Sequence, residues 1–462
     1  MSGPMALEPG DTGGDTLSLR LAADRTPARS APGPGAGRDA VDRLAAELAD
    51  GIGPAVHPYE VAALLESEGL TAEVIQERYG HPNLFSLASA LYERVPRTFP
   101  EPPRPADPWR PDHVRCALRG ALFALPGLAY LLTAPLWHAG RDLRVLVVAG
   151  LVSWAWGQAL GHRAYVRMAA GRREAGLTLL TGAPLGALTA TVAGALTGVA
   201  TGGSGTAIEV AAAQSVYLAA AGVLLVLGGE RLLLAALIPL IAGAAALPWW
   251  DPGPVPRVAV ALLSVLGSVA GAGWALRASL AASPVPGAAR PSLLRSLPYG
   301  VFGLSAGALV LLEGRQHPYA VVVLTVSMGP AEWLLYRFRG MSVSVLRATA
   351  TPAAFLVRST GVLGLCLLLY ALPLLPAALL TGAEPAPLLL LAATLWTALL
   401  LQAFGAAWLP AVVCLAAACG AASATVLRSL PGSDALTLSC GTACLCLAAC
   451  ALRLLGRPAP HA

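Results

Sequence analysis

The chain has 462 residues, of which 56% are hydrophobic and only 12% are charged, and its formal net charge is +5. An average soluble domain carries about 25% charged residues, so this composition excludes a fold that faces water on all sides. The positive charge is carried by arginine alone, and it becomes informative only when it is placed on loops between membrane spans.

The N-terminal segment, residues 1–37, is rich in Gly, Pro, Ala and Asp and shows no apolar periodicity. This composition predicts a disordered tail. The segment contains acidic residues and no apolar h-region, so we expect no secretory signal peptide. The first membrane span would then act as its own insertion signal.

Residues 38–97 place apolar side chains at helical spacing in four short segments, and we predict a soluble acidic helical domain there. Pro58 can occupy a first helical turn, Gly69 can follow a helix end, and Thr71 can cap the next helix. The range holds five arginines against ten acidic residues. Because a nucleic-acid reader needs a basic face, we predict no nucleic-acid partner and expect either a cytoplasmic protein partner or simple packing.

A proline-rich segment, residues 98–114, predicts a stiff linker. Beyond it the chain has runs of roughly 18–25 residues almost free of charge, the length of a helix that crosses about 30 Å of hydrocarbon. We therefore predict an all-α, polytopic integral membrane protein with about 12 transmembrane helices. The spans are expected near Cys116–Trp137, Leu143–Leu160, Ala175–Thr197, Ala207–Leu227, Leu232–Trp249, Val258–Leu276, Leu294–Leu312, Tyr319–Leu335, Phe355–Leu380, Pro387–Phe404, Ala407–Leu427 and Leu436–Leu454.

The spans divide into two predicted six-helix bundles, residues 115–283 and 284–456, followed by a C-terminal tail, residues 457–462. If both termini are cytoplasmic, seventeen arginines fall on inner connections and five on outer ones. This excess follows the positive-inside rule, and it predicts a multi-pass protein of the cell (cytoplasmic) membrane with both termini in the cytoplasm. The five outer arginines are Arg141, Arg144, Arg257, Arg315 and Arg428.

A weak internal repeat relates the two halves at an offset of 172 to 174 residues. Six helices separate the matching segments, so the halves would be related by an axis along the membrane normal, as in transporters whose substrate site lies between two rocking bundles. The prolines of the repeat, Pro126 and Pro298, are expected to kink their helices. The matches pair Leu125-Pro126 with Leu297-Pro298, and Val152, Ser153, Leu160 and Arg163 with Val326, Ser327, Leu334 and Arg337.

The stretch LPYGVFGLSAGALVLLEGRQHPYAVVVLTVSMGPAEWLLYRFRG resembles the start of the second half of exopolysaccharide exporters of the Pel type. Those exporters belong to the multidrug/oligosaccharidyl-lipid/polysaccharide (MOP) flippase superfamily. In that resemblance an acidic residue of the eighth helix precedes an aromatic-arginine ending, matched here by Glu332, Tyr336 and Arg337. The chain has Glu313 and Arg315, separated by a glycine, where an Asp-Arg pair is expected. The resemblance implies two six-helix bundles and a lipid-linked saccharide or polysaccharide as substrate.

Polar side chains at membrane depth are rare, and an ionisable one costs roughly 2.5–3.5 kcal/mol, which makes each a candidate for the substrate pathway. For the glutamines the alternative is hydrogen bonding between packed helices. Glu332 and Arg337 can instead form an intrahelical pair or sit at the inner interface. The candidates are Glu332, Arg337, Glu313, Gln158, Arg163 and Gln214.

No hydrolase, metalloprotease or nucleotide-binding motif occurs in the chain, and its His and Cys residues form no metal-ligand pattern. We therefore expect no enzyme activity, no metal and no cofactor, and we interpret the cysteines of the spans as small packing residues. One hypothesis is a flippase-like exporter of lipid-linked or polymeric saccharide that works by alternating access. The other is a non-transporting membrane scaffold or assembly factor that recruits a cytoplasmic partner through the acidic helical domain.

Overall fold

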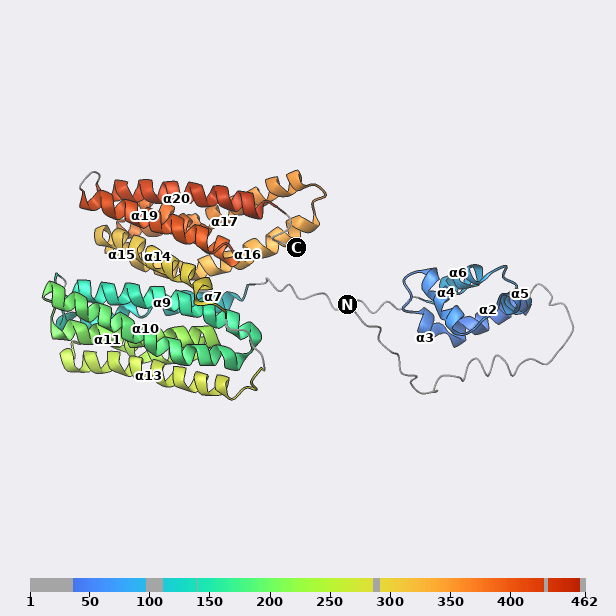
Figure 1. Ribbon diagram of the computed structural model, residues 1–462, viewed down its shortest axis with the longest axis horizontal. Helices are drawn as coiled ribbons and strands as arrows, with labels where there is room; N and C mark the ends of the chain where they lie inside the picture. The colour runs from blue at the N-terminus through green and yellow to red at the C-terminus, as the bar shows by residue number, and fades with distance from the viewer. Residues whose placement is uncertain (1–35, 97–110, 139, 286–290, 428–430, 458–462) are drawn as a thin grey trace. The chain divides into compact units, whose positions relative to one another are not determined.

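The computed structural model describes residues 36–96, 111–138, 140–285, 291–427 and 431–457. It divides into two compact units, Met1–Asp107 and Pro108–Ala462. Regular structure within the described ranges is helical throughout (Figure 1). Most of the predicted tail and of the predicted linker lies outside the described residues.

The N-terminal unit folds around an apolar core of its own, in which Leu65, Leu87 and Leu91 are fully buried. A separate core of this kind is what an independently folding domain requires. The helices of this unit are α2 (Ala36–Glu47), α3 (Ala49–Ile52), α4 (Pro58–Ser67), α5 (Ala72–Tyr79) and α6 (Leu84–Arg94).

Capping residues set the ends of these short helices. Pro58 opens α4, and Gly69 follows it with a φ of +73° that favours glycine. Thr71 stands at the N-cap position of α5 but its side chain makes no capping hydrogen bond. Asn83 does cap α6, because its Oδ1 accepts the backbone N–H of Ser86 at 2.8 Å.

The C-terminal unit is a stack of long apolar helices, and every predicted span coincides with a helical segment. Eleven such segments among the described residues are long and apolar enough to cross a membrane. The twelfth, α12, has 17 residues and carries charge only in its first turn. The helices are α7 (His113–Ala124), α8 (Gly127–Thr133), η1 (Ala134–Leu136), α9 (Leu143–Ala170), α10 (Arg172–Thr201), α11 (Gly205–Leu227), α12 (Glu230–Ala246), α13 (Pro254–Leu280), η2 (Leu293–Arg295), α14 (Leu297–Gln316), α15 (Pro318–Val326), α16 (Met328–Arg347), α17 (Pro352–Thr381), α18 (Pro385–Ala403), α19 (Trp408–Val426) and α20 (Gly432–Leu455).

Two spans are broken inside the membrane region. The first span consists of α7, α8 and η1, and it breaks at Pro126, which has no N–H to continue the helix. The eighth consists of α15 and α16, which separate at Ser327. Its helix continues to Arg347, well past the predicted end at Leu335, because long arginine side chains can reach water from a helix end that the bilayer still surrounds.

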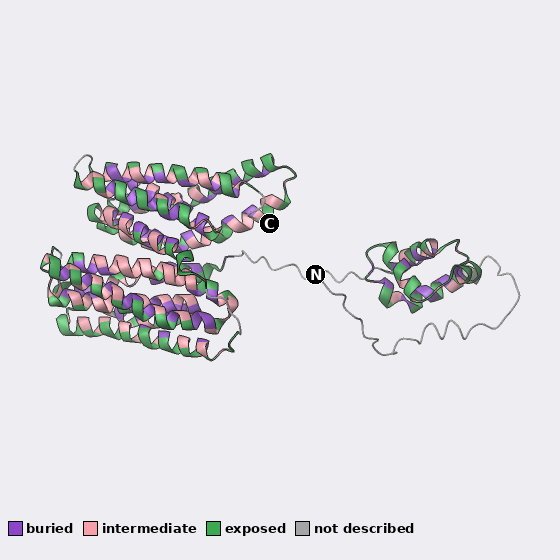
Figure 2. Cartoon of the chain, in the orientation of Figure 1, coloured by how far each residue is buried: buried purple, intermediate pink, exposed green. Residues whose placement is uncertain are grey.

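The surface of this unit is apolar where a soluble protein would be polar. Figure 2 shows exposed residues along the outer faces of both helix groups. On α13 they include Leu262, Leu263 and Leu266, and on α17 they include Leu368 and Leu372. Patches of this size are covered by lipid in a stable protein. The chain is therefore a multi-pass helical membrane protein, as the sequence predicted.

Two bundles make up the membrane unit, α7–α13 and α14–α20, each with its own buried cluster. They meet where α7 packs against α15 and α16 and where α9 packs against α14. In span numbers these are the first with the eighth and the second with the seventh. A rotation that exchanges the first span with the seventh and the second with the eighth turns one contact into the other. The bundle contacts thus follow the twofold relation that the repeat predicted.

A buried carboxylate joins two loops of the first bundle. Asp142 precedes α9 and is fully buried. Its Oδ2 accepts the backbone N–H of His138 at 2.9 Å and the Ser204 hydroxyl at 2.9 Å, while its Oδ1 accepts the Ser204 N–H at 2.8 Å. Hydrogen bonds from the backbone N–H groups of His138 and Ser204 lower the pKa of this carboxyl to about 2. Because Ser204 also caps α11, Asp142 connects the start of α9 to the start of α11.

The Asp142 carboxylate should make the stability of the folded protein depend on pH. Its pKa is depressed in the folded state relative to about 3.9 in an unfolded chain, so its stabilising effect is complete above roughly pH 4 and is lost as the pH falls towards 2. We expect Asp142→Asn to lower the thermal unfolding temperature at neutral pH and to flatten its pH dependence between pH 4 and 2. Glu209→Gln, an exposed carboxyl on α11, is the matched control. An unchanged unfolding curve for Asp142→Asn at neutral pH contradicts this role.

Candidate functional site

The backbones of the two bundles lie close together where α7 crosses α16. A Cβ added to Gly329 would lie 2.7 Å from the Cys116 carbonyl oxygen, and one added to Gly120 would lie 3.1 Å from the Gly329 Cα. Both obstacles are backbone atoms, so the approach requires glycine at these positions. Small residues of this kind allow membrane helices to pack at short distance.

Next to this crossing, four charged side chains form a group that we call the proximal ion cluster: Arg115, Arg119, Glu230 and Glu332. Arg119 on α7 donates from Nη1 to Glu332 Oε1 at 2.5 Å, and α16 carries Glu332. The same guanidinium donates from Nη2 to Glu230 Oε1 at 2.9 Å, and α12 carries Glu230. Arg115 Nε also binds Glu230 Oε1, at 2.8 Å. Arg119 therefore joins a carboxylate of the first bundle to one of the second.

The charges of this cluster balance one another, and three of its four side chains are largely buried. Two arginines face two glutamates, so the cluster is neutral as a whole. The side chains of Arg119, Glu230 and Glu332 are only 15%, 9% and 23% exposed. Partly buried charges attract each other more strongly than they do in water, and one left without its partner is costly. The Arg119–Glu332 pair is the part of this cluster that crosses between the bundles, so separation of the bundles leaves Glu332 without Arg119.

Glu332 does not pair with Arg337 along its own helix, which was one interpretation of the sequence. The Arg337 guanidinium instead lies 5.7 Å from the centroid of the Trp333 ring. The Trp333 indole N–H donates to His113 Nδ1 across the α7–α16 contact at 2.8 Å. The contact thus combines the ion cluster with one aromatic hydrogen bond.

The second bundle contact, α9 with α14, is a close packing of glycines against larger side chains. A Cβ on Gly303 would lie 2.9 Å from Gln158 Cγ, and one on Gly307 would lie 2.6 Å from Leu151 Cδ2. Gln158, a predicted pathway residue, therefore lies in the contact between the two bundles.

Polar groups close this contact at its end. The rings of His162 and Tyr299 stack with centroids 3.8 Å apart, and His162 Nδ1 lies 3.1 Å from the Ser296 hydroxyl. Arg163 Nη1 donates to the Pro291 carbonyl at 2.7 Å, which ties α9 to the segment that precedes α14. The predicted residue Arg163 thus stabilises the connection between the bundles.

Both contacts lie towards one end of the membrane unit, which we call the proximal end: the end where α7 and α14 begin and α9 and α16 finish. At the opposite, distal end α9 packs within its own bundle, where Val145, Leu146 and Ala149 lie against Ala207 and Ala211 of α11. The polar contacts between the bundles therefore lie at the proximal end, and the packing of α9 on α14 continues from there to Leu151 and Gly307.

Two predicted residues lie inside the bundles instead. Gln214 on α11 donates to the Leu146 carbonyl at 3.3 Å and so connects two helices of the first bundle. Glu313 on α14 is fully buried in the second bundle, and neither of its carboxylate oxygens has a hydrogen-bond partner among the described residues. An ionised carboxylate without a partner is expensive in such a place, which makes Glu313 a candidate for binding a proton or a cation.

The two predicted kink residues differ in position. Pro126 separates α7 from α8, whereas Pro298 lies in the first turn of α14. A proline in the first turn interrupts no helical hydrogen bond, so Pro298 stands at the start of α14 and not within the helix, where a kink would form.

The sequence interpretation missed Arg115, Arg119 and Glu230 as members of a site. Arg119 lies inside the predicted first span, Cys116–Trp137, and an arginine within a span is itself a signal. The partners are not visible in the sequence, because Arg119 is 111 residues from Glu230 and 213 residues from Glu332.

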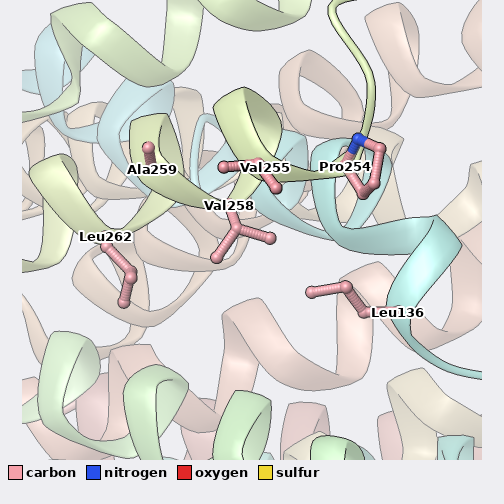
Figure 3. A pocket seen from close by; sticks show the side chains of 6 residues that line it. All are labelled: Leu136, Pro254, Val255, Val258, Ala259 and Leu262. Carbon is pink, nitrogen blue, oxygen red and sulfur yellow. The ribbon is translucent and has the colours of Figure 1, made fainter.

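A separate, open apolar pocket of about 350 Å³ lies between η1 and α13 (Figure 3). Its lining contains no polar side chain that could orient a saccharide. It is therefore not part of the proposed substrate pathway. The lining residues are Leu136, Pro254, Val255, Val258, Ala259 and Leu262.

Comparison with solved structures finds likeness to MATE transporters, and neither a family model nor a curated protein matches the chain. An outward-facing multidrug resistance MATE family transporter of the MOP superfamily is 14% identical, with 75% of this chain and 96% of that chain covered and a TM-score of 0.42. A MATE protein in the bent conformation is 16% identical, with 75% and 95% covered and a TM-score of 0.44. The MATE transporter ClbM in complex with Rb⁺ is 15% identical, with 74% and 94% covered and a TM-score of 0.42.

Proposed function

We propose that the protein is a membrane transporter that works by alternating access between its two bundles, with a lipid-linked or polymeric saccharide as substrate. The proximal end faces the cytoplasm in this proposal, in agreement with the arginine distribution. The resemblance to Pel-type exporters supports the choice of substrate class, and the polar side chains of the bundle interface, such as Gln158, are of the kind that bind sugar hydroxyls.

The observation that carries the proposal is the ionic bridge from Arg119 to Glu230 and Glu332. It joins the two bundles at one end only, and it consists of contacts that water can replace. A permanent interface would be secured more simply by apolar packing, since a buried ion pair contributes little net stability compared with well-packed apolar residues. A breakable neutral cluster suits an interface that opens and closes.

A flipping assay tests this function. The protein is reconstituted in vesicles with a fluorescent polyprenyl-pyrophosphate-linked disaccharide, and a membrane-impermeant quencher reports which leaflet holds the label. We expect the label of the inner leaflet to become accessible to the quencher faster than in protein-free vesicles. Gly127→Ala serves as a folded control with unchanged activity, because a Cβ there meets open space. If the wild type and protein-free vesicles behave alike while the protein remains folded, saccharide flipping is excluded.

The buried carboxyl of Glu313 carries a further part of the proposal: it binds the proton or cation that drives transport. We expect Glu313→Gln to fold normally and to flip the probe without a gradient, because the amide removes the unpaired charge. An imposed proton or Na⁺ gradient, which accelerates the wild type, should have less than one tenth of that effect on the variant. Adding Gln402→Glu to the Glu313→Gln variant should not restore the response to the gradient, because Gln402 belongs to a different helix, α18. An equal response of wild type and Glu313→Gln to the gradient contradicts a coupling role.

The scaffold function remains the second candidate, and the independently packed acidic unit favours it. Deletion of residues 39–95 separates the two candidates. Loss of a bound partner with flipping intact supports the transporter, whereas a protein that never flips and loses its entire cellular phenotype on deletion supports the scaffold.

A further inference from the structure

Three large apolar side chains of the N-terminal unit are exposed, one just before α4, one on α4 and one on α6. Val56, Tyr59 and Phe85 are 65%, 67% and 57% exposed. They are the exposed large apolar residues among the described residues of this unit, and its other large apolar side chains pack in or against the core. We call them the aromatic patch. An exposed apolar group that is rimmed by polar residues is typical of a protein-binding surface.

The aromatic patch is held in a defined geometry. The rings of Tyr59 and Phe85 meet edge to face with centroids 5.7 Å apart. The backbone before α4 is fixed on both sides of Val56, because its carbonyl accepts the Tyr92 hydroxyl at 2.7 Å and its N–H donates to Glu60 Oε2 at 3.0 Å. A preordered surface loses little conformational entropy when a partner binds.

Carboxylates lie on the same helix faces as the aromatic patch. Glu60 lies next to Val56, and each helix continues its exposed face from an aromatic ring to a glutamate about two turns further on. On α4 that face runs through Tyr59, Ala63 and Glu66, and on α6 it runs through Phe85, Ser89 and Glu93. The patch is therefore an apolar centre with an acidic rim.

The charge of the unit selects the chemistry of the partner. Residues 36–96 contain four arginines and ten acidic side chains. A negative surface of this strength repels nucleic acids and anionic lipid headgroups, and it attracts and orients a basic partner. An apolar centre with a charged rim is the arrangement that binds one face of an amphipathic helix.

We propose that the aromatic patch docks a basic amphipathic helix of a soluble protein. An apolar side chain of that helix packs on Tyr59 and Phe85, and its lysines and arginines lie against Glu60, Glu66 and Glu93. The N-terminal unit thereby brings a soluble partner to the membrane unit, whichever activity the membrane unit has.

Peptide binding to the full-length protein in nanodiscs of zwitterionic lipid tests this surface. The probe is a fluorescent 16-residue peptide of leucine and arginine with helical periodicity, and anisotropy reports its binding. We expect saturable binding that weakens at least tenfold when Tyr59 and Phe85 are both changed to alanine. The conservative changes Tyr59→Phe and Phe85→Tyr should retain it, because they keep the rings.

A charge reversal provides a second, independent variant. The double variant Glu66→Arg, Glu93→Arg should bind the leucine–arginine peptide at least tenfold more weakly than the wild type. It should also bind a leucine–glutamate peptide of the same pattern. Equal binding of both peptides by the wild type overturns the proposal, as does full binding by the double alanine variant. Failure of the basic peptide to bind, or self-association of the chain through the aromatic patch, also overturns it.

Discussion

Replacing Arg119 with alanine opens the proximal end of the bundle interface and exposes the Cys116 thiol, which is only 4% exposed in the closed structure. Without Arg119, Glu332 has lost its partner in the first bundle. Breaking a buried pair in this way costs about 3–5 kcal/mol, and the partial exposure of this cluster reduces our expectation to about 2 kcal/mol. Because about 1.4 kcal/mol corresponds to a factor of ten, the alkylation rate of Cys116 should rise roughly thirtyfold.

The measurement is alkylation by maleimide in isolated membranes, with Cys116 resolved from the other seven cysteines by peptide mass spectrometry. Arg119→Lys should give an intermediate rate, because an ammonium keeps the charge but lacks the planar fork that reaches both carboxylates. Arg144→Ala, a change near the distal start of α9, should leave the rate unchanged. A rate in Arg119→Ala equal to that of the wild type shows that the ion cluster does not hold the bundles together.

Replacing Gly329 with alanine should separate the same two helices by steric contact alone. The new Cβ would stand 2.7 Å from the Cys116 carbonyl oxygen, a backbone atom that cannot move without moving α7. In an exposed helix the change from glycine to alanine is favourable by about 1 kcal/mol. Here we expect the opposite sign: a thermal unfolding temperature lowered by several degrees, faster alkylation of Cys116, and at least a tenfold loss of probe flipping.

Glycines in open space supply the controls for this experiment. A Cβ on Gly157 or Gly161 of α9 meets nothing within 4 Å, so alanine at either position should leave stability unchanged or raise it. If Gly329→Ala behaves like these two variants, the close crossing of α7 and α16 is not needed for the folded or the active state.

The number and order of the spans could be predicted from the sequence because hydropathy is a local property. A run such as Val258–Leu276 is apolar whatever its neighbours are, and only a helix satisfies its backbone groups in lipid. The predicted span boundaries were less accurate where the end of a helix depends on its surroundings. The eighth span ran on to Arg347 because a long arginine side chain lets a helix continue through the interface.

The candidate site was predicted only in part. Glu332 was identified because a carboxylate at membrane depth is unusual in itself, but its partner was not. Arg119 and Glu230 looked like ordinary charges near the ends of spans, and nothing local connects them to α16. Gln158 and Gln214 could not be told apart, because both are single amides within apolar helices, although one lies between the bundles and the other inside one of them.

From the amino-acid sequence alone came the membrane location, the even number of helices and the relation between two halves, since each depends on residues that are neighbours along the chain. The tertiary structure decided which charges meet. Arg119 reaches Glu332 only because Gly120 and Gly329 let two helices of different bundles cross at backbone distance, and the strength of that contact depends on the water that the packed bundles exclude.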